Sequence, residues 1–104
     1  MTVSANMLVI NEIGLHARPA ADFVKGIAGL NAEIKIRNTT KDSDWHNAKS
    51  IIDVLSLGIE NGHEIEITCS GEDENNVLKT LKDQFTSFFR FCGDNGHGPA
   101  LADV

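Results

Sequence analysis

Apolar and polar residues alternate along three stretches of the chain, and this pattern predicts strands. Residues 32–37 and 63–69 alternate strictly, so each should be half-buried. Residues 3–10 are apolar on both sides, which indicates a strand that is buried on one face and partly covered on the other. A polar loop over 38–44 should lead into a short fourth strand around Trp45 and His46.

Two longer stretches place apolar residues at helical spacing. The first begins near His16 and should end at about Ala28, and the second begins at Asp73. A third, shorter helix should begin at Ser50. The apolar stripes of the two long helices comprise Ala20, Phe23, Val24 and Ile27, and Val77, Leu78, Leu81, Phe85 and Phe88.

The order strand, helix, strand, strand, helix, strand, helix predicts an α+β fold. We expect a two-layer open-faced sandwich in which three helices cover one face of a four-stranded antiparallel sheet. At 104 residues the chain has room for one core. We assign residues 1–91 to this domain. Residues 92–104 should form a disordered tail, because from Gly93 on they hold three glycines and one proline without periodicity.

Charge and cysteine content narrow the class of protein. A net charge of −6 argues against nucleic acid as a partner, because phosphate backbones attract basic surfaces. No signal peptide or membrane-spanning stretch is visible, so we expect no membrane insertion. Cys69 and Cys92 do not make a disulfide framework, which favours a cytoplasmic protein.

The stretch Gly14-Leu-His-Ala-Arg-Pro-Ala-Ala carries the strongest chemical signal. Gly14 has no Cβ restriction, and Pro19 falls in a first helical turn, where its missing N–H breaks no bond. His16 then lies beside the free N–H groups of a helix start, with the Arg18 guanidinium two residues on. Together with the backbone N–H groups of Ala17 and Arg18, this arrangement suits a phosphate. The structural alternative is that His16 only caps the helix.

At this point the sequence resembles a known family. Residues 14–20 resemble the phosphohistidine signature of HPr, the phosphocarrier of the bacterial phosphoenolpyruvate-dependent sugar phosphotransferase system. Residues 47–52, Asn-Ala-Lys-Ser-Ile-Ile, resemble the regulatory-serine segment of that family. Leu57-Gly58, Gly62 and the run 71–74 also fit, so the resemblance covers roughly residues 3–90 in the family's order.

The resemblance implies the same sandwich fold and a phosphocarrier function. Phosphorylated enzyme I would transfer a phosphoryl group to the Nδ1 atom of His16, and Arg18 and the first-turn N–H groups would stabilise its oxygens. An enzyme IIA component would then accept the group. The chain would need no metal or cofactor, and it would be a transfer component of a phosphotransferase and not a complete enzyme.

The short helix has a structural and a functional interpretation. Ser50 followed by Asp53 at the third position is close to a capping box, which predicts Ser50 as an N-cap. The resemblance adds that an HPr kinase/phosphorylase phosphorylates this serine in some bacteria. It also places Ile51, Ile52 and Leu55 on the partner surface near His16. The alternative for these apolar residues is that they fill the core.

Three features differ from the usual pattern of the family. Ile13 stands where a small polar residue is common, Asp53 stands where a basic or small one is common, and the chain continues further after the last helix. They favour an alternative, a nitrogen-type or purely regulatory paralogue that acts through protein binding and not in sugar uptake. A metal-carrying module on a similar fold is a different class, and it would want a Cys-x-x-Cys that this chain lacks.

Overall fold

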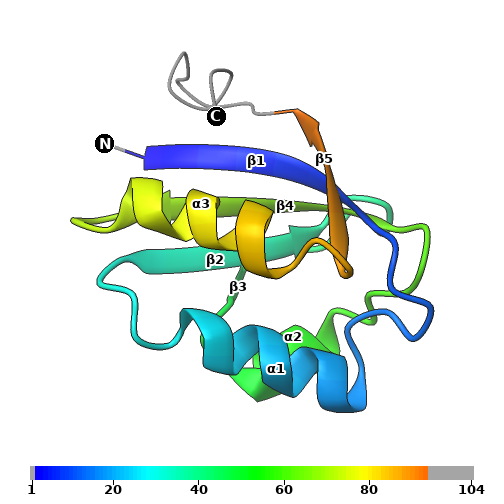
Figure 1. Ribbon diagram of the computed structural model, residues 1–104. Helices are drawn as coiled ribbons and strands as arrows, with labels where there is room; N and C mark the ends of the chain where they lie inside the picture. The colour runs from blue at the N-terminus through cyan, green and yellow to red at the C-terminus, as the bar shows by residue number, and fades with distance from the viewer. Residues whose placement is uncertain (1, 94–104) are drawn as a thin grey trace.

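The computed structural model describes residues 2–93 (Figure 1). The elements in chain order are β1 (Thr2–Val9), α1 (Ala17–Ile27), β2 (Glu33–Asn38), β3 (His46–Asn47), α2 (Ile51–Ser56), β4 (Glu64–Ser70), α3 (Glu74–Gln84) and β5 (Phe89–Gly93). Within this part of the chain, no helix has the length and apolar character needed to cross a membrane.

The α+β prediction is confirmed, with three helices against an antiparallel sheet (Figure 1). The predicted count of four strands is wrong, because the sheet has five strands in the order β3-β2-β4-β1-β5. The additional strand, β5, pairs with β1 and places Phe89 opposite Val9 and Phe91 opposite Met7. Because directly paired residues share a face, this pairing covers the edge of the core with aromatic rings.

The prediction that the last helix extends its buried stripe to Phe88 is also wrong. The helix ends at Gln84, and Phe85 has φ −114° and ψ 34°. The backbone N–H groups of Phe88 and Phe89 both donate to the carbonyl oxygen of Phe85 at 3.0 Å, which turns the chain back toward the sheet. β5 includes Cys92 and Gly93, and the predicted disordered tail otherwise falls on residues 94–104, which lie outside the described residues.

The core lies between the sheet and the helices. Alternate residues of β1, β2 and β4 point into it, as the sequence predicts, together with the apolar stripes of α1 and α3. Phe23 of α1 makes edge-to-face contacts with Phe85 and Phe89, with ring centroids 5.6 Å apart in each pair. The buried residues of the described chain include one polar side chain, Asn38.

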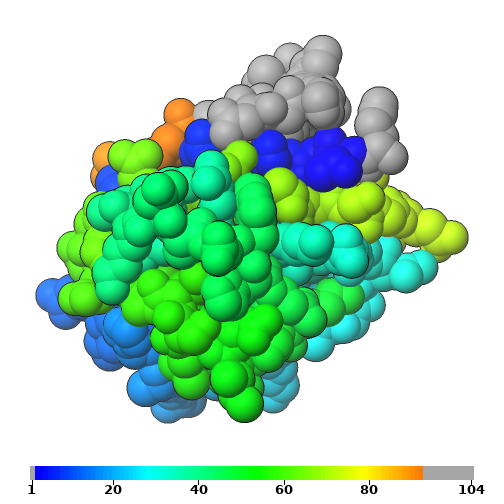
Figure 2. Space-filling view, turned by 180° about the vertical axis from the view of Figure 1, so that it is seen from behind, coloured from blue at the N-terminus to red at the C-terminus, as the bar shows by residue number. Residues whose placement is uncertain are grey.

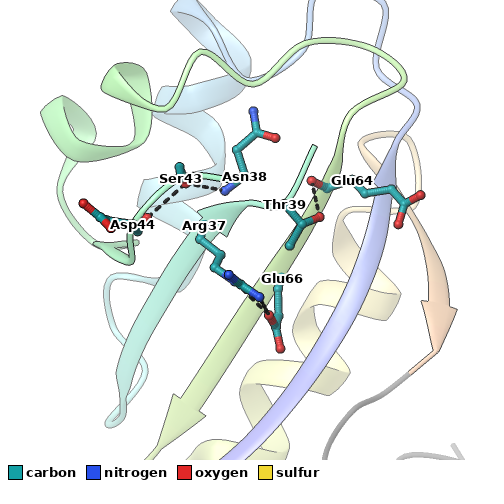
Figure 3. Close-up of polar contacts among 7 residues, drawn as sticks. All are labelled: Arg37, Asn38, Thr39, Ser43, Asp44, Glu64 and Glu66. Atoms are coloured by element: carbon teal, nitrogen blue, oxygen red, sulfur yellow. Dashed lines mark hydrogen bonds and ion pairs between the residues drawn. The ribbon is translucent and has the colours of Figure 1, made fainter. Parts of the chain in front are cut away.

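The loop after β2 is tied back to the sheet by hydrogen bonds at its start (Figure 3). Asn38 and Ser43 exchange two bonds: the Asn38 N–H donates to the Ser43 hydroxyl at 2.8 Å, and the Ser43 N–H donates to the Asn38 carbonyl at 3.0 Å. The Thr39 hydroxyl donates to the carbonyl of Glu64 at 2.9 Å. The loop is therefore ordered although its sequence is polar.

Trp45 lies on the solvent-facing side of the sheet. Its ring is 5.1 Å from the Arg37 guanidinium, and Arg37 forms an ion pair with Glu66 at 2.9 Å. Trp45 remains 40% exposed. It therefore covers the neighbouring strand without entering the core.

Candidate functional site

His16 is the N-cap of α1, which confirms that the helix begins near this residue. Its backbone is extended, with φ −122° and ψ 157°, and its side chain makes no capping hydrogen bond. The ring is half-buried, whereas Ala17 and Arg18 are exposed. The first N–H groups of a helix have no intrahelical acceptor, so those of Ala17 and Arg18 are available beside the imidazole. Within residues 2–93, no carboxylate forms an ion pair with Arg18.

Ala17 has an unusual backbone conformation for a residue with a Cβ atom. Its φ is +50°, in the left-handed region that normally costs such a residue about 1–2 kcal/mol. Strain of this kind is found most often at functional sites. Nothing in the sequence predicts it, because alanine has no preference for this conformation.

The segment before His16, residues 10–15, which we call the site loop, begins with a tight turn. The Asn11 side-chain oxygen accepts from the Ile13 N–H at 3.0 Å, and the Asn11 carbonyl accepts from the Gly14 N–H at 2.9 Å. Gly14 has φ +76°, which confirms that this position needs a residue without a Cβ atom. Leu15 follows and is fully buried.

A second segment, residues 59–63, supports the site loop, and we call it the supporting turn. The Ile59 carbonyl accepts from the Leu15 N–H at 3.0 Å, and the Gly62 N–H donates to the Val9 carbonyl at 2.8 Å. The Asn61 side chain donates to the Asn11 carbonyl at 3.2 Å. Asn61-Gly62 is typical of a turn, but nothing in the sequence shows that this turn lies against the site loop, because the two segments are more than 40 residues apart.

Ser50 is the N-cap of α2, as predicted. Its hydroxyl accepts from the Asp53 N–H at 3.4 Å, a long hydrogen bond. The capping box is altered, because the Asp53 carboxylate accepts from the Asn47 N–H at 3.1 Å and not from the N–H of Ser50. The ammonium group of neighbouring Lys49 donates to the Leu30 carbonyl at 2.6 Å.

The apolar residues of α2 are exposed on the surface. Ile52 is 74% exposed, whereas Ile51 and Leu55 are 37% and 40% exposed. α2 lies beside α1 (Figure 1), and its surface in green adjoins the blue N-terminal part of α1 in Figure 2. The residue that α2 contributes to the core is Val54, which is fully buried. The three exposed residues therefore do not fill the core.

Other nucleophilic and metal-binding groups do not form a site in the described residues. Burial, with a smaller effect from the Glu74 carboxylate, raises the pKa of the Cys69 thiol from 9.0 to about 12, so this thiol is not a nucleophile near neutral pH. Among residues 2–93, no three His, Cys, Asp or Glu side chains come close enough to hold a metal ion.

A protein-family model matches most of the chain. The model for "PTS HPr component phosphorylation site" matches residues 3–87. Among curated proteins, the chain is 38% identical over 81 residues to a multiphosphoryl transfer protein of Salmonella typhimurium, covering 78% of this chain and 22% of the relative. The chain thus spans about a fifth of the length of such relatives. It is also 33% identical to the phosphocarrier protein NPr of Escherichia coli K12, covering 86% of this chain and 97% of NPr.

Solved structures show the same fold. HPr-C-His from Thermoanaerobacter tengcongensis is 36% identical with a TM-score of 0.73, and the match covers 81% of this chain and 91% of that chain. The phosphocarrier protein HPr from Bacillus anthracis is 39% identical with a TM-score of 0.71, covering 77% and 92%.

Proposed function

The chain belongs to the HPr family of phosphotransferase-system proteins, and from this premise we propose that it is a phosphocarrier whose acceptor is His16. Phosphorylated enzyme I would donate the phosphoryl group, and an enzyme IIA component of a sugar phosphotransferase system would receive it. The observation that carries the proposal is the imidazole of His16, held at a helix start without using its nitrogens for capping.

The reaction needs a nucleophile and positive groups around the phosphoryl oxygens. A nitrogen of the neutral His16 ring would attack phosphorus, and the bond from phosphorus to the donor would break as the nitrogen–phosphorus bond forms. The Arg18 guanidinium, exposed and free of ion pairs within residues 2–93, would pair with the phosphoryl oxygens. The N–H groups of Ala17 and Arg18 would add the positive end of the helix dipole.

Ile51, Ile52 and Leu55 support a docking role for α2. An exposed apolar patch beside the reactive residue allows transient association with enzyme I and enzyme IIA. Transfer in both directions requires complexes that dissociate quickly, and a patch of three aliphatic side chains suits this requirement. The transfer itself would take place in the cytoplasm, without a metal or cofactor on this chain.

Ser50 supports a second, regulatory role. The hydroxyl is half-buried at the start of α2, next to the proposed docking patch, where a kinase such as HPr kinase/phosphorylase would modify it. A phosphate there would face the Asp53 carboxylate, and the nearby Lys49 ammonium already binds the Leu30 carbonyl. The start of α2 would favour a phosphate on Ser50, yet the phosphate would place negative charge beside the patch and weaken docking.

A nitrogen-type or purely regulatory role is the second candidate. It is favoured by the match to NPr, which extends over nearly the whole length of that protein. In this role His16 would still accept phosphate, but from a nitrogen-type enzyme I. The two candidates therefore differ in the donor and acceptor and not in the site.

Phosphoryl transfer from phosphoenolpyruvate tests both candidates. The wild type and His16→Ala would be incubated in parallel with a sugar-type and a nitrogen-type enzyme I, and phosphorylation measured by intact mass. We expect an acid-labile phosphate on the wild type and none on His16→Ala, and the preferred enzyme I identifies the role. Failure of both enzymes, each active on its own carrier, would refute the phosphocarrier function.

A further inference from the structure

The ring of His63 holds the supporting turn from within. Its Nδ1 atom accepts from the backbone N–H of Glu60 at 3.1 Å, and the Nδ2 atom of Asn38 lies 3.1 Å from the same Nδ1. The Glu60 carbonyl in turn accepts from the His63 N–H at 3.0 Å. The turn is therefore closed by one backbone bond and one bond to the imidazole.

The contacts of Asn38 show that its amide presents N–H to the ring. Its side-chain oxygen accepts from the Lys41 N–H at 3.2 Å, and its side-chain nitrogen donates to the Leu57 carbonyl at 3.3 Å. The nitrogen is thus the atom next to His63. In Figure 3 the side chains of Asn38 and Arg37 leave β2 in opposite directions, and Asn38 is the one that is fully buried.

Two N–H donors therefore point at one ring nitrogen. Both contacts are hydrogen bonds when Nδ1 carries no hydrogen, which is the case for a neutral ring with its hydrogen on Nε2. A protonated ring carries a hydrogen on both nitrogens. Protonation would place an N–H on Nδ1 against the N–H groups of Glu60 and Asn38, and both contacts would be lost.

Short contacts connect the supporting turn to the residues just before His16. Glu60 follows Ile59, whose carbonyl accepts from the Leu15 N–H, and Leu15 precedes His16. The backbone of Ile59 and Glu60 also lies so close to Gly14 that there is no room for a Cβ atom. A shift of the turn therefore moves the site loop as well.

On this basis we propose that His63 is a positioning residue for His16 and makes phosphoryl acceptance sensitive to acid. The inference rests on the proposed phosphocarrier function. A neutral His63 ring holds the supporting turn and the site loop in the geometry for transfer. The imidazolium releases the turn, displaces His16 and slows transfer, since small misplacements of a reacting group have large effects on rate.

Charged residues lie on the segments that adjoin His63 and the supporting turn in sequence or in space. Glu60 and Glu64 flank it in sequence, Lys41 lies on the loop that bonds to Asn38, and Glu12 lies on the site loop. None of these side chains forms a hydrogen bond with the ring within residues 2–93. The direct partners of the ring are thus the two N–H donors.

Three variants separate the role of Nδ1 from that of protonation. In His63→Asn the side-chain oxygen takes the place of Nδ1, so it accepts the same bonds but does not titrate. His63→Leu removes the acceptor. His46→Asn is the matched control, because His46 lies on β3 and its ring has no hydrogen bond within the described residues. The rate of phosphorylation by enzyme I would be measured for each from about pH 5.5 to 8, the range in which histidines titrate.

The rate ratio of variant to wild type removes every effect of pH that is common to the two reactions. We expect the ratio for His63→Asn to be near one at pH 8 and to rise about three- to tenfold at pH 5.5. His63→Leu should be slower than His63→Asn at pH 8, and His46→Asn should keep a constant ratio. A flat ratio for His63→Asn would overturn the inference while leaving the phosphocarrier function intact. A wild type that accepts no phosphate at any pH would refute that function instead.

A spectroscopic measurement on the unmodified protein gives an independent test. The amide resonances of Glu60 and Leu15 should shift with the same midpoint as the ring of His63 in the wild type, and should lose this transition in His63→Asn. Amide shifts that do not follow the ring of His63 would contradict the proposed connection.

Discussion

A Cβ atom on Gly14 would lie 2.4 Å from the carbonyl oxygen of Ile59 and 2.7 Å from the Cα atom of Glu60. Contacts under 3.0 Å to backbone atoms are not relieved by moving a side chain. The site loop thus lies directly on the supporting turn, and the missing side chain of Gly14 makes this approach possible. The glycine before His16 is therefore needed for packing as well as for its φ of +76°.

Gly14→Ala should destabilise the fold and displace His16. We expect a loss of about 2–4 kcal/mol in the free energy of unfolding, because strain at positive φ adds to the backbone clash. Urea denaturation measures the stability, and the rate of phosphorylation at His16 measures the displacement. Gly29→Ala is the matched control, since a Cβ there meets nothing within 4 Å and its φ is not positive. Equal stability of the two variants would contradict this account of Gly14.

Arg18→Ala should slow phosphoryl transfer without changing stability. The side chain is exposed and forms no ion pair within residues 2–93, so the free energy of unfolding should change by less than about 0.5 kcal/mol. Losing the guanidinium should lower the rate at least about tenfold, and Arg18→Lys should recover part of it. Lys25→Ala in the last turn of α1 is the control for a general effect of charge. A rate for Arg18→Ala equal to that of Lys25→Ala would exclude Arg18 from the site.

The sequence predicts the start of α1 and the cap of α2 well because both depend on local chemistry. Pro19 belongs in a first turn, and a serine three residues before an aspartate is a common helix cap. The alternation over residues 32–37 and 63–69 likewise predicts the buried face, since a strand side chain can point to one of two sides.

The features that the sequence does not predict depend on contacts between distant segments. The sequence does not predict β5, because its apolar residues follow directly on a helical stripe and it forms a strand by pairing with β1. The supporting turn carries no local sign of its contact with Gly14. The position of Asn38 is the one sign in the sequence of these distant contacts. It follows Ile34 and Ile36 on the buried face of the strand, where a polar side chain needs hydrogen-bond partners.

Cys69 and Cys92 should differ strongly in reactivity. Cys92 is exposed and should react with a thiol reagent in the native protein, whereas Cys69 is fully buried and should react when the protein unfolds. Because the pKa of Cys69 is about 12 in the folded chain and 9.0 otherwise, the unfolded chain loses this proton first as pH rises. Stability should therefore fall as pH rises above about 9, and Cys69→Ala should lack this component. If Cys69 and Cys92 reacted with the reagent at the same rate in the native protein, Cys69 would not be buried.

Ile52→Glu should weaken partner binding and leave the fold intact. The side chain is 74% exposed, so the cost in stability should be under about 0.5 kcal/mol. Loss of an interface contact of about 1–2 kcal/mol should raise the KM for transfer from enzyme I roughly five- to thirtyfold, with little change in kcat. Trp45→Ala is the control, because this exposed ring lies on the opposite, solvent-facing side of the sheet. If Trp45→Ala raised the KM as much, α2 would not be the docking site.

Ser50 combines a structural role with a proposed regulatory one, and two substitutions separate them. Ser50→Ala removes the cap oxygen and should cost about 0.5–1 kcal/mol, the low end for N-caps, because its bond to the Asp53 N–H is long. Ser50→Asp keeps a cap oxygen and adds a negative charge, so it should retain more stability than Ser50→Ala but raise the KM with enzyme I. Thermal denaturation measures the first effect, and transfer kinetics at two salt concentrations measure the second. Since the added charge acts next to the exposed residues of α2, high salt should reduce its effect. If Ser50→Ala raised the KM as much as Ser50→Asp does, both increases would come from the loss of the serine cap. Charge at Ser50 would then have no regulatory effect.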